Sequence, residues 1–196
     1  MTQTLNPQSG YRFKMKVGVV FFHQNISKIY KKRWVDKCID SINKQTYKPL
    51  HLYEVNYGDC NMQLVEGAKF FNEKFINHSV GMNFIISKAF EDGCDYVFNT
   101  NMDDFYEFVR IETQLKFLEK GYDIVSSDFF EINEDDEIQA YRHMAGHGSI
   151  RANLTVNHNV IAHPAVAYNR EFWEDSENRY GENDIPEEDL QELIPH

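Results

Sequence analysis

The sequence lacks any apolar run long enough to cross a membrane. Its longest runs, such as Val17 to Phe22, fall far short of the roughly 20 residues that a membrane-spanning helix requires. The first fourteen residues also lack the apolar core of a signal peptide. We therefore expect a soluble, cytoplasmic protein with no membrane span.

Cysteines are few and widely spaced. There are three, Cys38, Cys60 and Cys94, and none belongs to a CxxC pair. An odd number of isolated thiols fits neither a disulfide framework nor a cysteine-rich metal site. The pattern favours reduced, mostly buried thiols in a reducing compartment.

Basic residues are outnumbered and do not cluster. Lysine and arginine total 20 against 31 aspartates and glutamates, which gives a net charge of -11. A polyanionic partner needs lysine and arginine concentrated on one face, so we expect no nucleic-acid partner. A small anionic substrate stays compatible with this charge if a metal ion supplies the compensation.

The length and composition predict one globular domain. The chain has 196 residues, of which 42% are hydrophobic, enough to bury a core without disulfides. We expect residues 1–14, which are polar, to be a flexible leader or a cloning remnant, and residues 15–196 to form a single catalytic domain. The chain ends two residues after its last predicted helix, which suggests a C-terminal truncation of a longer protein.

Strand and helix patterns alternate over the first two thirds of the chain. The run KVGVVFFH at Lys16–His23 is typical of a strand buried on both faces of a parallel sheet, and we expect it to be the central one. Further strands are expected at Leu50–Val55, Asp95–Thr100 and Tyr122–Ser127. Apolar spacings of three and four predict helices over Lys31–Lys44, Met62–Phe75, Val80–Phe90 and Glu107–Glu119. The alternation predicts a mainly parallel α/β sheet.

The pattern changes after Asp128. The next stretch reads as an antiparallel hairpin at the sheet edge, with the acidic tip Asn133–Glu137 between its strands. Shorter elements are expected beyond it: strands at Val156–Ala162 and Val166–Tyr168, a helical turn at Glu171–Trp173, a loop over Asp175–Pro186 and a final helix at Glu187–Ile194.

The clearest candidate site is the segment Asn99-Thr100-Asn101-Met102-Asp103-Asp104, where a buried strand ends in a loop. In open α/β sheets ligands bind beyond the carboxyl ends of the strands. Paired carboxylates there suit Mg²⁺ or Mn²⁺, which prefer oxygen ligands and keep positions open for phosphate oxygens. The alternative is that Asp103 or Asp104 merely caps the following helix.

A second acidic cluster, Glu187-Glu188-Asp189, lies near the C-terminus. A carboxylate beside an acceptor hydroxyl can take its proton during a displacement. The alternative is a solvated acidic first turn, which the helix dipole favours.

Histidines supply two further candidates. His163 follows an apolar strand, so it either contacts a ligand or simply makes a hydrogen bond at the strand end. His143, His147 and His158 lie in or beside the stretch HMAGHGS, and HxxxH also occurs at zinc sites. Zinc is the weaker alternative, because this loop lacks helical character and shows no third ligand.

Taken in order, these segments resemble the family 2 glycosyltransferases of the GT-A fold, from about Lys16 to Leu193. KVGVVFFHQN resembles the opening strand of the family, and WVDKCIDSINKQTYKPLHLYEVNYGD its first helix and second strand. SVGMNFIISKAFEDGCDYVFNTNMDD is similar to the segment that leads to the metal-binding acidic motif. GYDIVSSD, IAHPAVAYNREFW and EEDL complete the succession, the last resembling the Glu-Asp base motif.

The resemblance implies roles for the acidic residues. Asp103 would bind the metal and the diphosphate, with Asp104 beside it and Asn101 in place of the motif's first aspartate. Asp189 would be the general base, with Glu188 as its neighbour.

The resemblance also implies a donor-binding set. Beyond Asp103 and Asn101, this set comprises Asn25, Asn56, Asp59, Asn83 and His163, with His163 also lining the acceptor side. Tyr57 stands where many members carry an aspartate against the nucleotide base, which leaves the identity of the nucleotide open.

The implied function is inverting, metal-assisted transfer of a sugar from a nucleotide-diphospho-sugar to an acceptor hydroxyl on a glycan or protein-linked glycan, with Mn²⁺ or Mg²⁺. One alternative is a catalytically silent nucleotide-sugar-binding domain, favoured by Asn101 and Tyr57. A nucleotidyltransferase is disfavoured, because FFHQNISKIYKKR lacks the glycine-rich phosphate loop expected after its first strand.

Overall fold

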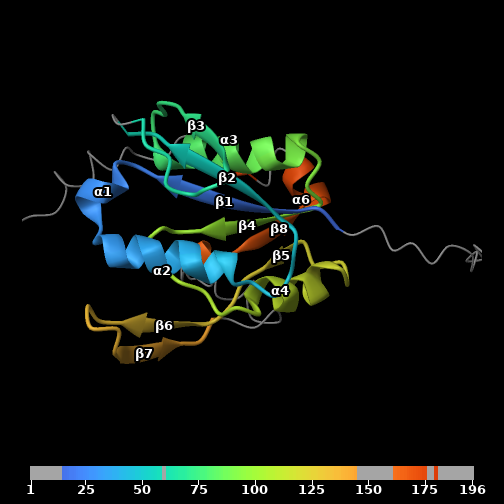
Figure 1. Ribbon diagram of the computed structural model, residues 1–196. Helices are drawn as coiled ribbons and strands as arrows, with labels where there is room; N and C mark the ends of the chain where they lie inside the picture. Colours follow the sequence, from blue (N-terminus) through green and yellow to red (C-terminus); the bar gives the residue numbers. More distant parts are fainter. Residues whose placement is uncertain (1–14, 59–60, 145–160, 176–178, 181–196) are drawn as a thin grey trace, which may run out of the picture.

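A computed structural model describes residues 15–58, 61–144, 161–175 and 179–180. Six strands form one sheet in the order β3-β2-β1-β4-β8-β5 (Figure 1). Strands β1, β2, β3 and β4 are mutually parallel, and β8 runs antiparallel between β4 and β5. The strands are β1 Val17–His23, β2 Leu50–Asn56, β3 Lys69–Asn72, β4 Tyr96–Thr100, β5 Ile124–Val125 and β8 Ala167–Asn169.

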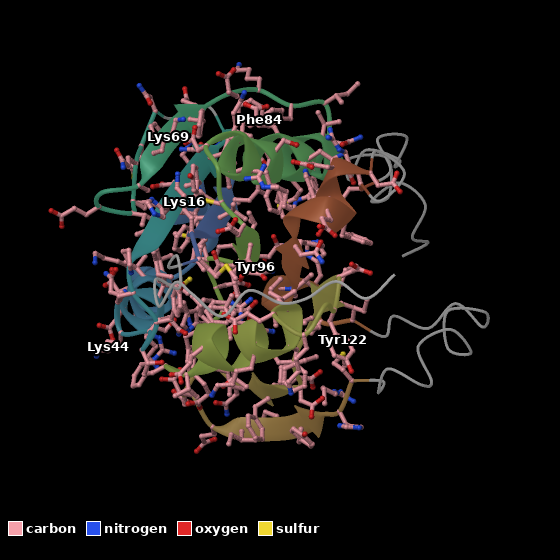
Figure 2. All side chains as sticks on the ribbon, turned by 90° about the vertical axis from the view of Figure 1, so that its right-hand side faces the viewer. Lys16, Lys44, Lys69, Phe84, Tyr96 and Tyr122 are labelled. Carbon is pink, nitrogen blue, oxygen red and sulfur yellow. The ribbon has the colours of Figure 1, made fainter. Side chains whose placement is uncertain are left out.

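Helices cover both faces of this sheet. Helices α2 and α4 lie on one face and α3 and α6 on the other (Figure 1). Figure 2 views the sheet from its amino-terminal end, and there Lys44, just after α2, and Phe84 of α3 lie on opposite sides of Lys16 and Tyr96. The helices are α1 Ile26–Ile29, α2 Lys32–Asn43, α3 His78–Glu91, α4 Arg110–Leu118 and α6 Arg170–Glu174, with a 3₁₀ turn η1 at His163–Ala165.

Strand β1 is apolar up to its last residue, His23, because both of its faces are buried. Val17, Val19 and Phe21 pack in the core on the α2 and α4 side, while Val20 and Phe22 pack in the core on the α3 side. The expected central strand and the mixed, mainly parallel α/β sheet with flanking helices are confirmed.

The prediction of a helix over Met62–Phe75 was wrong. This stretch forms a turn followed by β3, which pairs parallel with β2. Two features oppose a helix: Gly67 has a φ of +76°, and the Glu54 carboxylate accepts the backbone N–H groups of Leu64 and Val65. The apolar spacing of four imitated a helical face, but the open edge of β2 provides the pairing that decides the structure.

The predicted hairpin is present, but it does not extend the edge of the main sheet. Strands β6 (Phe129–Ile132) and β7 (Ile138–Arg142) form a two-stranded sheet of their own. Its acidic tip is tied to α2, since Lys31 pairs with Glu134 and Lys37 with Asp136. These ion pairs hold the hairpin beside the helix instead of in the sheet.

Several further expectations can be compared with the described residues. Helices α2, α3 and α4 and strands β4, β5 and β8 lie where they were expected, within a few residues. Cys38 and Cys94 are buried free thiols. No helix among the described residues has the length and apolar character needed to cross a membrane. The strand expected at Val156–Ala162 lies mostly, and the helix expected at Glu187–Ile194 entirely, outside the described residues.

Candidate functional site

The carboxyl ends of β1, β2 and β4 meet at one edge of the sheet. In the strand register His23 pairs with Asn56, and Phe21 pairs with Thr100. The loops that begin after these strands therefore start side by side. This edge is where open α/β sheets bind ligands.

The loops after β1 and β2 pack directly against each other. Asn25 is in the left-handed conformation, with a φ of 47°, and its side chain lies over Gly58. A Cβ on Gly58 would come within 2.3 Å of the Asn25 Oδ1 atom, so a larger residue there requires the Asn25 side chain to move.

Asn56 fixes the shape of the second loop. Its Oδ1 accepts the Gly58 N–H at 3.0 Å, and its Nδ2 donates to the Met62 carbonyl at 3.2 Å. The residue is fully buried. Contact between Asn56 and a donor nucleotide stays a prediction, while the observed bonds make it a support for the loop that starts at Tyr57.

The acidic loop after β4 places Asp103 in solvent and leaves Asp104 half-buried. Burial, and then the neighbouring Asp103 charge, raise the pKa of Asp104 to about 6, although the Arg110 cation opposes the shift. Helix α4 begins at Arg110 with Val109 as its N-cap, so neither aspartate caps it. The capping alternative is therefore excluded, and two adjacent carboxylates lie at the carboxyl edge of the sheet.

The carboxylate pair suits a hard cation only in part. Within the described residues no group of three or more histidine, cysteine, aspartate or glutamate side chains is placed to hold a metal ion. Mg²⁺ and Mn²⁺ commonly take one or two protein carboxylates and fill their other positions with water and substrate phosphates. Asp103 and Asp104 therefore fit a metal that is bound together with a phosphate ligand.

A buried cation lies beneath the acidic loop. Arg110 is 6% exposed, and its guanidinium lies 4.3 Å from the centre of the Tyr106 ring. Its Nη2 donates to the Asn99 carbonyl at 2.9 Å and to the Pro164 carbonyl at 3.5 Å. One arginine thus joins the end of β4 to the turn that carries His163.

Two neighbours of Arg110 strengthen this link. The Tyr106 hydroxyl accepts the Asn101 N–H at 2.9 Å and donates to the Pro164 carbonyl at 3.3 Å. Gln114, which accepts a bond from Arg110 Nε, donates to the Ala165 carbonyl at 2.8 Å. Sequence reasoning missed all three residues, because no local motif marks a bond between loops this far apart in the chain.

His163 does reach the same edge of the sheet. It begins η1, and its ring centre lies 6.2 Å from that of His78 at the start of α3 and 5.1 Å from that of Tyr180. Burial, and then the proximity of His78, lower the pKa of His163. Its imidazole is therefore neutral at pH 7 and can both donate and accept a hydrogen bond.

An aromatic row continues from His78 toward the loop after β2. Phe22 meets the His78 ring edge-on, with 4.6 Å between ring centres, and stacks on Tyr57 at 4.4 Å. The row runs from Tyr57 to His163, so the donor-side and acceptor-side residues expected from the sequence border one continuous surface.

Asn83 lies at this surface but binds the protein itself. Its Nδ2 donates to the Tyr180 carbonyl at 2.9 Å, and its Oδ1 accepts the Tyr180 N–H at 3.0 Å. The predicted contact of Asn83 with the nucleotide is untested, and its observed role is to hold Tyr180 against α3.

A cavity of about 470 Å³ opens beside His163 on the α3 face of the sheet. Residues of strands β5 and β8 and helix α6, together with His163 and Tyr180, line this open cavity. Its lining residues are Ile124, Ile161, His163, Val166, Tyr168, Phe172, Trp173, Arg179 and Tyr180. This volume falls within the range of small-molecule pockets.

A buried polar cluster of Glu54 and His23 lies where β1 and β2 end. The fully buried Glu54 carboxylate accepts from Leu64 N at 2.7 Å and Val65 N at 2.8 Å, and it lies 2.8 Å from His23 Nε2. This cluster holds the turn before β3 against β1 and β2. Nothing in the local sequence indicated it.

The remaining candidates do not join this site among the described residues. His143 lies on the hairpin strand's end, 3.1 Å from Asp128, and belongs to no metal-binding group there. Asp59, Glu188 and Asp189, together with His147 and His158, lie outside the described residues.

Comparison of the sequence with protein-family models and with curated proteins gave no match. Solved structures do match the fold. TarS from S. aureus, residues 1–349 in complex with UDP, has a TM-score of 0.59 at 13% identity over 86% of this chain and 51% of that one. The mannosyltransferase PcManGT from Pyrobaculum calidifontis, in complex with GDP-Man and Mn²⁺, has a TM-score of 0.57 at 12% identity over 88% and 49%.

The fold is that of GT-A glycosyltransferases. The expected resemblance in fold is thereby confirmed. This GT-A chain spans about half the length of the structures it matches. Identities this low establish the arrangement of the backbone and no more, so donor, metal and acceptor are matters for proposal.

Proposed function

We propose that this chain is a glycosyltransferase that uses a nucleotide-diphospho-sugar as its donor. The observation that carries the proposal is the placement of Asp103 and Asp104 at the carboxyl edge of a GT-A sheet, on a loop tied from beneath by Arg110. TarS binds UDP and PcManGT binds GDP-Man with Mn²⁺ on the same type of fold, which supports a nucleotide-sugar donor here.

Asp103 and Asp104 would hold the metal, Mn²⁺ or Mg²⁺. A divalent ion bound there would neutralise charge that develops on the departing diphosphate. Burial is the main cause of the raised pKa of Asp104 and the charge of Asp103 adds to it, so a divalent ion bound there would favour the ionised carboxylates. Asn101, which replaces the first acidic residue of the motif, would supply a neutral polar contact in the same loop.

The donor would lie along the row from Tyr57 to His163. Tyr57 presents a half-buried ring at the loop that Asn25 and Asn56 support, where a nucleotide base can stack. Asp59, Asn83 and His163 complete the proposed donor-binding set. The neutral imidazole of His163 would bond a sugar hydroxyl on the acceptor side.

The proposed chemistry is an inverting single displacement. The acceptor oxygen forms a bond to the anomeric carbon while the bond from that carbon to the diphosphate oxygen breaks. Asp189, with Glu188 beside it, would take the proton of the acceptor hydroxyl. General-base assistance contributes roughly 10²- to 10⁴-fold in rate.

The domain extent, the location of the protein and the acceptor are also proposals. We propose one catalytic domain over residues 15–196, a cytoplasmic location and a glycan or protein-linked glycan as acceptor.

Calorimetry tests the donor site. UDP, GDP and their sugar derivatives are titrated into the protein with Mn²⁺, with Mg²⁺ and with a chelator. We expect metal-dependent binding of one nucleotide class, lost in Asp103→Ala and kept in Asp135→Ala, which removes a carboxylate from the hairpin tip. Failure of every nucleotide to bind would overturn the proposal.

Turnover separates an enzyme from a silent binding domain. With the nucleotide class known, release of the nucleoside diphosphate is followed in the wild type and in Asp189→Asn. We expect donor affinity to persist in this variant while turnover falls about 10²-fold or more. Binding without turnover in the wild type, with any metal and any glycan acceptor tried, would instead identify a silent domain, an alternative that Asn101 favours.

A further inference from the structure

We infer that the cavity beside His163 is a binding pocket for a pyranose ring of the acceptor. That the bound sugar belongs to the acceptor rests on the proposed function. That a sugar binds in the cavity does not depend on the proposed function.

Four aromatic side chains, those of Tyr168, Phe172, Trp173 and Tyr180, contribute to the wall. Tyr168 packs against Phe172, with 6.3 Å between ring centres and 11° between planes, and against Trp173 at 5.4 Å. Trp173 in turn lies 6.3 Å from Tyr180. The C–H bonds on one face of a pyranose carry partial positive charge, and the faces of aromatic rings are negative. Tyr168 and Trp173 are buried, so the half-buried rings of Phe172 and Tyr180 are the ones on which a sugar ring would stack.

Polar groups are confined to part of the lining. The hydroxyls of Tyr168 and Tyr180 bond to each other, and Asn99 Nδ2 donates to them at 3.4 and 3.2 Å. Within the described part of the chain, Asn99 Oδ1 is buried and has no hydrogen-bond partner. His163 adds a neutral imidazole. Asn99 is not a lining residue, so it supports the two hydroxyls from behind the wall. An alkyl chain would leave the His163 imidazole without a partner, whereas sugar hydroxyls can bond to it and to the Tyr180 hydroxyl.

The mouth of the cavity also suits a sugar. Arg179 is exposed and lies with its guanidinium 5.9 Å from the centre of the Trp173 ring. A guanidinium fork donates readily to vicinal hydroxyl groups. Through His163 the cavity borders the row that leads to the proposed donor. A ring bound in it would thus present a hydroxyl toward the reacting centre.

The position of Tyr180 is set by Asn83. Two hydrogen bonds between the Asn83 amide and the Tyr180 backbone hold Tyr180 in the wall without a bound ligand. A pocket with fixed walls loses less entropy on binding than one that must be ordered.

Tryptophan fluorescence tests the inference. The sequence has two tryptophans, and Trp34→Phe leaves only Trp173, in the cavity wall. Methyl pyranosides of glucose, galactose, mannose and N-acetylglucosamine are titrated into this variant without nucleotide or metal. We expect a saturable change in Trp173 emission with at least one of them. No change in Trp173 emission with any of these sugars would overturn the inference. The same change in free indole, titrated with the sugar in the absence of protein, would also overturn it.

A matched pair of variants locates the binding. Tyr180→Ala should weaken the sugar by about tenfold, because it removes one stacking wall. Phe130→Ala removes an exposed ring from β6 and should leave the affinity unchanged. Equal affinities in the two variants would count against the pocket. If Tyr180→Ala does not fold, Tyr180→Phe replaces it, because this variant keeps the ring and loses only the hydroxyl. We expect it to weaken sugar binding by less than tenfold. Unaltered sugar affinity in Tyr180→Phe would contradict the proposed polar contacts.

The result is independent of the donor experiment. Sugar binding without nucleotide binding would support the pocket and refute the proposed function. Nucleotide binding without sugar binding would do the reverse.

Discussion

Arg110 donates from Nη2 to the backbone carbonyl of Asn99 at 2.9 Å. Asn99 is a buried residue of β4, one position before the strand ends at Thr100 and the acidic loop begins. The same atom reaches the carbonyl of Pro164, in the turn that begins with His163. A single buried side chain therefore ties the proposed metal loop to the proposed acceptor side, and a shift of either is opposed by the other.

Tyr106→Phe tests that link with the smallest change. The hydroxyl satisfies the Asn101 N–H and donates to Pro164, and its loss leaves a partly buried donor without a partner. We expect the free energy of unfolding to fall by ~1–2 kcal/mol and metal-dependent nucleotide affinity to fall with it. Urea unfolding and calorimetry measure the two effects.

Tyr96→Phe is the control for that variant. The Tyr96 side chain is half-buried at the start of β4, and its hydroxyl makes no hydrogen bond to the described residues. It should change neither quantity. Equal effects of the two substitutions would show that the hydroxyl of Tyr106 has no special role.

Gly58→Ala should disturb the loop that carries Tyr57. The added Cβ would meet the Asn25 side chain at 2.3 Å, so that side chain must move from its place between the two loops. Overpacking of this kind costs ~1–3 kcal/mol. We expect nucleotide affinity to fall as well, because the base would stack on Tyr57. Calorimetry and thermal unfolding provide both values.

Gly121→Ala separates strain from loop packing. Gly121 has a φ of +92°, so alanine is strained there, but no atom lies within 4 Å of the added Cβ. It should lower stability and leave nucleotide affinity intact. Loss of affinity in both variants would mean that general destabilisation, and not the loop, is responsible.

Much of the fold could be predicted from periodicity alone. The run from Val17 to His23 indicated a doubly buried strand, and the helices with clear apolar faces followed in their expected places. The helix expected at Met62–Phe75 failed because its spacing was a local signal, whereas β3 is decided by pairing with β2 and by the Glu54 carboxylate.

The candidate site was less predictable than the fold. The acidic loop could be located because a strand end precedes it, and His163 because it follows an apolar segment. Asn83 pointed to the right region, but its bonds to Tyr180 depend on a contact between residues 97 positions apart. Arg110 carried no signal, because a buried arginine on an amphipathic helix looks like any other polar residue in the sequence.

Glu54→Gln should destabilise the protein strongly. Its buried carboxylate serves three groups, on Leu64, Val65 and His23, and an amide replaces one acceptor oxygen with a donor. The donor that faces it is left unpaired, at a cost of ~2 kcal/mol or more. Chemical unfolding measures the loss. Glu66→Gln, on an exposed side chain of the same turn, should be neutral, and matching losses would refute the special role of Glu54.

Asp128 should titrate at unusually low pH. Its carboxylate accepts the Tyr141 hydroxyl and the Met144 N–H and lies beside His143, which together lower its pKa to about 2. The unfolded value is ~3.9. Because the folded pKa is the lower one, this carboxylate stabilises the hairpin fully above the unfolded value and loses its contribution as the pH falls toward 2. Carbon NMR of the aspartate carboxyl groups measures the midpoint directly. In Tyr141→Phe the strongest of these bonds is gone, so the midpoint should rise toward 3.9. A wild-type midpoint already near 3.9 would mean that Asp128 does not hold the end of β7, and the position of His143 would then need another cause.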